Sequence, residues 1–293
     1  MARERAKERA CETAIKRTLA YRSTFNYPLS FYQLGTYLIS KRRFDYKFLR
    51  KILRRLLKNK SVRVRKKRYF LPSTKPVSWR IRIQNTKDIL EKNDLVFSLL
   101  NKIPWIKMIG VTGSLASYNS IEGDDIDLFV ITEKNRLWLS RLFLVLILKT
   151  INKYPDQNGD HGKICPNIMI DENHLSWPEN KRNIYTANEI LQLQPVRCKD
   201  NMYFRFIREN DWIFAYFSNF RIQFPKHYNE EKQKSGFVDL LEDSVMETQL
   251  NYMSKRKTKE ITEKGFVHFN VHDSTKEVIK AYRNRLKKIK IRT

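Results

Sequence analysis

One segment constrains the fold of this chain more than any other: VTGSLASYNSIEGDDIDLFVIT, at residues 111–132. Its last seven residues, 126–132, are mostly apolar and β-branched, which predicts a buried strand. Asp125 and Asp127 lie two positions apart at the start of that strand, and alternation turns both carboxylates to the same face. Because adjacent carboxylates repel each other, the pair predicts a bound cation, and Mg²⁺ (with Mn²⁺ as the alternative) suits oxygen ligands.

Gly113 and Ser114 precede the pair, directly after a short apolar strand predicted at 107–111. Such a position indicates a turn into a helix. A helix start presents unpaired backbone N–H groups, and together with the Ser114 hydroxyl these groups can hold phosphates. The segment therefore predicts a site for a nucleoside triphosphate (NTP) at Gly113 and Ser114.

Gly-Ser followed by Asp-x-Asp on an apolar strand resembles the signature of the polymerase-beta-like nucleotidyltransferase superfamily. Four further phrases, RLWLSRLFLVLILK, KICPNIMIDENHL, IYTANEILQLQP and FIRENDWI, are similar to a bacterial group of that superfamily with an N-terminal winged helix. The resemblance covers roughly residues 20–225. It implies a palm-like catalytic domain with Mg²⁺ at Asp125 and Asp127 and nucleotide phosphates at Gly113 and Ser114.

The superfamily usually places a third carboxylate on a later strand that faces the pair. The matching strand here is KICPNIMID, and its middle position holds Asn167, which cannot serve as a base. Asp171 lies four residues on and shares the same face by alternation, although it is at the strand's end. We take Asp171 as the third catalytic and metal-binding residue; the alternative is that no third carboxylate is present.

Positive charge is concentrated at the amino-terminal end. The chain carries a formal net charge of +27, and residues 1–75 hold 23 basic and four acidic side chains. A concentrated positive field recruits polyanions, and phosphate backbones are the commonest of them. Nucleic acid is therefore an expected partner, with RNA favoured and DNA as the alternative.

The same end has the pattern of a winged helix-turn-helix. Apolar residues between 44 and 57 recur at helical spacing, and a basic helix face lies opposite them. Residues 62–71 then alternate as a hairpin does, around a basic tip. In winged helices the second helix can enter a groove. The residues expected to contact nucleic acid are Lys47, Arg50, Lys51, Arg54, Arg55, Lys66, Lys67 and Arg68.

We therefore expect an α+β chain, in which a small mixed β-sheet, palm-like nucleotidyltransferase domain lies between a winged helix-turn-helix and C-terminal helices. Pro166 in the third strand indicates an edge or a bulge. The expected parts are a basic helix with the winged helix (1–75), a helical connector (76–104), the catalytic domain (105–175), a helical region packed on it (176–225) and a polar region ending in a basic helix or tail (226–293).

Two functions from different classes follow. The first is an enzyme that transfers a nucleoside monophosphate from an NTP to a hydroxyl of RNA, such as a tRNA-like end, and releases pyrophosphate. The second is a winged-helix DNA-binding regulator whose nucleotidyltransferase-like domain senses nucleotides. The sequence has no apolar signal core, and its longest apolar run, 142–148, is too short for a membrane span, so a cytoplasmic protein without a membrane partner is expected.

Overall fold

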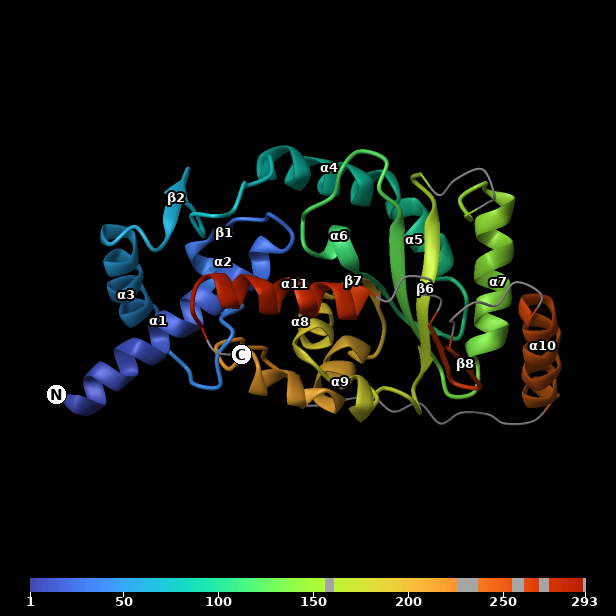
Figure 1. Cartoon of the computed structure of the whole chain (residues 1–293). Coiled ribbons are helices and arrows are strands. Elements are labelled where there is room, and N and C mark those ends of the chain that lie inside the picture. Colours follow the sequence, from blue (N-terminus) through green and yellow to red (C-terminus); the bar gives the residue numbers. More distant parts are fainter. Residues whose placement is uncertain (156–160, 226–236, 255–260, 269–273, 292–293) are drawn as a thin grey trace.

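The computed structural model describes residues 1–155, 161–225, 237–254, 261–268 and 274–291. Within them the chain is a mixed α+β protein, and the prediction of that class is confirmed. Figure 1 shows a helical region with a small sheet at the N-terminal end, next to a larger sheet with helices on both sides.

The N-terminal region runs helix, strand, two helices and a hairpin. Its elements are α1 (Ala2–Ser23), β1 (Leu29–Ser30), α2 (Phe31–Thr36), α3 (Tyr46–Lys58), β2 (Arg63–Arg65) and β3 (Arg68–Phe70). The strands form one antiparallel sheet in the order β1-β3-β2. Side chains set both helix starts, because Ser30 Oγ accepts a hydrogen bond from Gln33 N at 3.1 Å and Asp45 accepts one from Phe48 N at 2.8 Å.

Helix α3 is amphipathic, as its spacing predicts. It buries Leu49, Ile52, Leu53 and Leu56 and packs against α1. The hairpin that follows turns at 66–67, where both lysines have positive φ, 47° and 61°. A two-residue loop with positive φ at both positions matches the right-handed twist of its strands.

The larger sheet has six strands among the described residues, in the order β7-β4-β5-β6-β9-β8. They are β4 (Ile106–Val111), β5 (Ile126–Thr132), β6 (Ile164–Asp171), β7 (Gln194–Cys198), β8 (Ile261–Glu263) and β9 (Phe266–His268). Strands β5 and β6 run parallel and the other neighbouring pairs are antiparallel, so the sheet is mixed.

The remaining helices connect and cover these strands. They are α4 (Trp79–Lys92), α5 (Asp94–Leu100), α6 (Gly113–Ala116), α7 (Leu137–Thr150), α8 (Ile184–Gln192), α9 (Met202–Glu209), α10 (Phe237–Ser254) and α11 (Ser274–Lys288), with 3₁₀ turns at Glu179–Lys181 and Asp211–Ala215. Helices α7 and α10 lie on one side of the sheet, and α8 and α9 lie on the other (Figure 1).

Alternation along β5 divides the sheet between two cores. Leu128 and Val130 join the cluster that contains residues of α7, whereas Phe129 and Ile131 join the cluster that contains residues of α8 and α9. Asp127 has the parity of Phe129. Its carboxylate therefore projects to the α8 side of the sheet.

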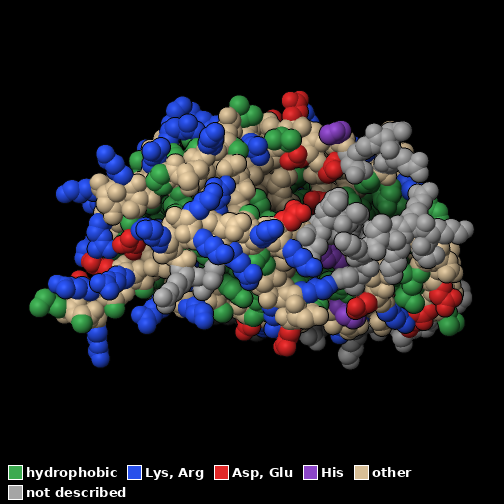
Figure 2. Space-filling model, in the orientation of Figure 1, with side chains coloured by type: hydrophobic (Ala, Val, Ile, Leu, Met, Phe, Trp, Pro, Cys, Tyr) green, Lys and Arg blue, Asp and Glu red, His purple; other side chains and the backbone are tan. Residues whose placement is uncertain are grey.

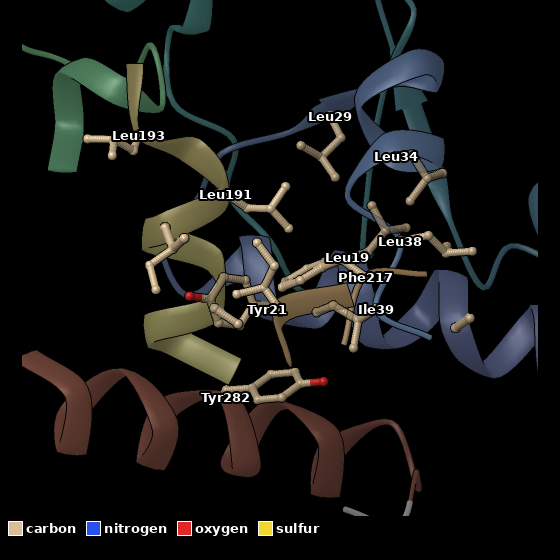
Figure 3. Close-up of a cluster of buried hydrophobic side chains, with 14 of the residues drawn as sticks. Leu19, Tyr21, Leu29, Leu34, Leu38, Ile39, Leu191, Leu193, Phe217 and Tyr282 are labelled. Atoms are coloured by element: carbon tan, nitrogen blue, oxygen red, sulfur yellow. The ribbon is translucent and has the colours of Figure 1, made fainter. Parts of the chain in front are cut away.

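A buried cluster fastens the N-terminal region to this side of the sheet. Leu19 and Tyr21 from α1 pack with Leu191 from α8, Leu193 just after it, and Tyr282 from α11 (Figure 3). The rings of Tyr21 and Tyr282 meet edge to face, with centroids 5.4 Å apart. Burying side chains of this size contributes about 1.5–3 kcal/mol each, so the end of α1 is held firmly near α8.

The structure also corrects several expectations. The helical connector is two helices, α4 and α5, which meet at Asn93. The helical region expected at 176–225 includes the edge strand β7 as well as helices. The C-terminal region supplies α10 and the β8–β9 hairpin besides the basic helix α11. Pro166 lies beside a register irregularity opposite β5, between Asp127 and Phe129, so the bulge was the right alternative.

Candidate active site

Gly113 and Ser114 form the turn between β4 and α6. Gly113 has φ +63°, in the left-handed region that favours glycine. A Cβ at this position would lie 3.3 Å from Asp127 Oδ2, so the glycine also lets the backbone come close to the carboxylate. The Thr112 N–H donates to the Asp127 carbonyl oxygen at 3.0 Å. The Gly113–Ser114 turn therefore lies next to the Asp127 carboxylate.

Asp125 and Asp127 lie at the start of β5. The pKa of Asp127 is raised to about 6, first by burial and then by the negative charges of Asp125 and Asp124. The Asn167 amide acts in the opposite direction, because its Nδ2 donates to Asp127 Oδ1 at 3.4 Å. A divalent cation between the two carboxylates would relieve their repulsion, and a site with oxygen donors fits Mg²⁺.

Asp124 has a different place. Its Oδ2 accepts a hydrogen bond from the Ile121 N–H at 3.0 Å, and it thereby caps the turn before β5. The loop between α6 and this turn is held from outside, because Arg82 of α4 donates to the Asn119 carbonyl and side-chain oxygens at 2.9 and 3.1 Å. Hydrogen bonds therefore hold the loop that leads into β5, the strand on which Asp125 and Asp127 lie.

Asp171 does not join the pair, and its prediction as a third catalytic and metal-binding carboxylate is wrong. It is opposite Thr132, at the far end of β5 from Asp127, and at about 3.3 Å per residue the two positions lie about 16 Å apart. Its buried oxygens instead accept hydrogen bonds from Asn135 N, Asn173 N and His174 Nδ1 at 3.0, 2.9 and 2.7 Å. Alternation failed for the face as well as for the distance along the strand. Beyond the bulge at Pro166, Ile168 and Ile170 join the core on the Asp127 side, whereas Met169, which has the parity of Asp171, joins the core on the α7 side.

The carboxylate of Glu189 reaches the site from α8. Glu189 of α8 lines the same cavity as Asp127 and Asn167. Burial raises the pKa of Glu189 to about 7; Arg22, the Asn188 side chain and the Gly113 backbone lower it, and Asp127 raises it. The sequence offers one signal for this residue, a single acidic side chain within the otherwise uncharged run 184–196.

Two hollows adjoin at Gly113. The first, of about 300 Å³, has a polar end formed by Thr112, Asp127, Asn167 and Glu189. The rest of its lining is mainly apolar and aromatic, and includes Phe129, Trp177, Tyr185, Ile190, Leu193 and Phe206. The second, of about 290 Å³, shares Gly113, Tyr185, Glu189 and Ser274 with the first and continues past Ser114. Together they offer room on both sides of the turn.

The basic side chains predicted to contact nucleic acid lie in the N-terminal region, where Lys and Arg gather over α1, α3 and β2 (Figure 2). Two of them are paired within the protein: Lys51 contacts Glu8 at 2.8 Å, and Arg55 contacts Glu8 and Glu12 at 2.8 and 3.2 Å. Arg68 is partly buried, and it donates to Gln33 Oε1 within the fold. The remaining predicted contacts, Lys47, Arg50, Arg54, Lys66 and Lys67, are exposed.

No protein-family model matches the chain, and no curated protein matches it either. Over the described ranges, no cluster of three or more His, Cys, Asp or Glu side chains forms a ready-made metal site. None of the helices in these ranges combines the length and apolar character that a membrane span requires.

Proposed function

We propose that this chain is a metal-dependent nucleotidyltransferase, which transfers a nucleoside monophosphate from an NTP to an acceptor hydroxyl. The observation that carries the proposal is the close approach of the Gly113–Ser114 turn to Asp127, with Asp125 alongside. A turn that can hold phosphates and a carboxylate pair that can hold a cation are the two halves of such a site. Their juxtaposition supports the resemblance to the polymerase-beta-like superfamily.

The architecture adds two weaker supports. The mixed β4-β5-β6 arrangement, which carries the carboxylates at the start of its central strand, is compatible with a palm-like domain. The order helix, strand, two helices and hairpin in the N-terminal region is the order of a winged helix.

Each polar residue of the site then has a role. Asp125 and Asp127 would hold Mg²⁺, which supplies positive charge against the phosphates when bound. Ser114 and the backbone at the start of α6 bind the β- and γ-phosphates. The acceptor oxygen forms a bond to the α-phosphorus while the bond from that phosphorus to the bridging oxygen breaks. Glu189 takes the hydroxyl proton, and pyrophosphate leaves.

We propose RNA as the acceptor. The concentration of basic residues over α3 and the β2–β3 tip matches a phosphate backbone better than a small molecule, since only a polyanion would contact so wide a surface. Lys47, Arg50, Arg54, Lys66 and Lys67 are the exposed side chains that would make these contacts.

The test uses purified protein with each α-labelled NTP, Mg²⁺ or Mn²⁺, and total cellular RNA. Label should enter RNA with the native protein and not with Asp125→Asn/Asp127→Asn. Asp124→Asn is the matched control, because it makes the same chemical change next to the pair and should keep activity. Label in protein or in small molecules would keep the chemistry and reject RNA as the acceptor.

One observation favours a second function. The amide of Asn167, rather than a carboxylate, faces Asp127 from β6. A site that lacks this third negative charge suits nucleotide binding without turnover, as in a winged-helix DNA-binding regulator that senses nucleotides. Metal-dependent NTP binding without transfer to any acceptor, together with DNA binding that depends on the NTP, would favour this regulator over the enzyme.

A further inference from the structure

A buried arginine lies beside the phosphate-holding turn. Arg22, in the last turn of α1, is 6% exposed and lines the second hollow together with Ser114 and Glu189. It belongs to the N-terminal region, but the cluster around Leu19 and Tyr21 holds its backbone against α8 (Figure 3). The guanidinium therefore has a fixed position relative to Gly113 and Ser114.

The guanidinium is incompletely satisfied by the protein. Its Nη1 donates to Gln192 Oε1 at 3.0 Å, and the group lies 5.6 Å from the centre of the Tyr27 ring. Arg22 Nε is buried without a hydrogen-bond partner, and the charge of Glu189 acts on the guanidinium from the wall of the same hollow. A buried donor without an acceptor is costly, and a bound anion that accepts a hydrogen bond from it would stabilise the guanidinium.

The rest of the hollow suits phosphate oxygens. Ser114, Ser117 and Asn119 contribute polar side chains, and Ser274 places the N-terminus of the 15-residue helix α11 at its wall. Two acidic residues also line it. Glu189 lines both hollows and interacts electrostatically with both Arg22 and Asp127, and Glu277 is exposed to solvent.

We propose that Arg22 binds the distal phosphates of an NTP held at the Gly113–Ser114 turn, so that the N-terminal region completes the nucleotide site. The inference rests on the proposed function and deepens it, because it makes the site selective for triphosphates. A guanidinium forms charge-assisted, often bidentate hydrogen bonds to phosphate, which a nucleoside monophosphate lacking β- and γ-phosphates would not receive.

The test compares binding of ATP and AMP in Mg²⁺ by calorimetry, for native protein, Arg22→Met, Arg22→Lys and the control Arg17→Met. Arg17 lies one and a half turns earlier on α1 and lines a different hollow. The native protein should prefer ATP, and Arg22→Met should weaken ATP binding about tenfold or more while leaving AMP binding unchanged. Arg22→Lys keeps the charge but not the planar fork, so an intermediate loss of ATP affinity is expected.

The outcomes separate the two proposals. An unchanged ATP-to-AMP preference in Arg22→Lys, and in Arg22→Met where that variant folds, would overturn the assignment of Arg22 while leaving nucleotide transfer intact. An equal loss of affinity for both nucleotides would also overturn it, because it would indicate a purely structural role. Failure of the native protein to bind any NTP in Mg²⁺ would reject both proposals.

Discussion

Replacing Glu189 with glutamine should stabilise the protein at alkaline pH. The folded-state pKa of about 7 lies above the ordinary value of 4.5, because burial disfavours the charged form. The ionised side chain therefore destabilises the fold. The stability that the neutral form provides is fully present below pH 4.5 and is lost as the pH rises through 7.

The magnitude follows from that shift. A difference of about 2.5 pKa units corresponds to about 3 kcal/mol at 1.36 kcal/mol per unit, and the partial exposure of Glu189 reduces the expectation to about 1–3 kcal/mol. Glu189→Gln removes the ionisation and keeps the shape. It should unfold at a higher temperature than the native protein at pH 8, by about 2–4 °C for each kcal/mol.

The assay is thermal unfolding of both proteins in EDTA from pH 4.5 to pH 8.5. The difference between the two curves is the relevant quantity, because the other titrating groups contribute to both. It should be close to zero at pH 4.5 and should grow between pH 5 and pH 8. A difference that is constant with pH, or that favours the native protein at pH 8, would refute the proposed placement of Glu189 in a partly buried site beside Asp127.

Three further perturbations test neighbouring features. Gly113→Ala should destabilise the fold by about 1–2 kcal/mol, because alanine is strained at φ +63°; urea unfolding measures this, and a neutral substitution would contradict it. Asn167→Asp places a third carboxylate beside Asp127, so it should lower stability at pH 8 in EDTA and tighten Mg²⁺ binding about tenfold. Thermal shift against Mg²⁺ concentration measures this, and an unchanged Mg²⁺ affinity would argue against a metal at this position. Glu8→Gln/Glu12→Gln should release Lys51 and Arg55 of α3 and give tighter RNA binding with a steeper salt dependence. An unaltered salt slope in a filter-binding series would show that these two basic residues do not contact RNA.

Local periodicity was sufficient for part of the fold and of the site. The apolar positions of α3 repeat at helical spacing, and the direction of Asp127 follows from strand alternation, so both were predictable from a few neighbouring residues. The Gly113 turn was predictable for the same reason, because a short apolar strand precedes it and a glycine can adopt its backbone conformation.

Long-range packing decided the remainder. Glu189 and Arg22 reach the site only because α8 and α1 pack against the same side of the sheet, and no local pattern contains that information. Asp171 was misplaced because the bulge in β6 inverts the alternation beyond it, and because alternation specifies no distance along a strand. Strand β7 was missed because it is a short, shallowly buried edge strand that follows α8 almost directly.

The pairing of β9 with β6 affects how the protein folds during synthesis. Ile170 pairs with Phe266, 96 positions later in the chain, and α11 packs against α1 and α8. Contacts this distant in sequence form slowly, because a long loop must close before they contribute any free energy. While it is being translated, the nascent chain can form α1 and β4–β7, but the hollow beside Arg22 has no α11 wall until that helix leaves the ribosome. The selectivity for triphosphates that we propose should therefore be among the last properties that a newly made molecule acquires.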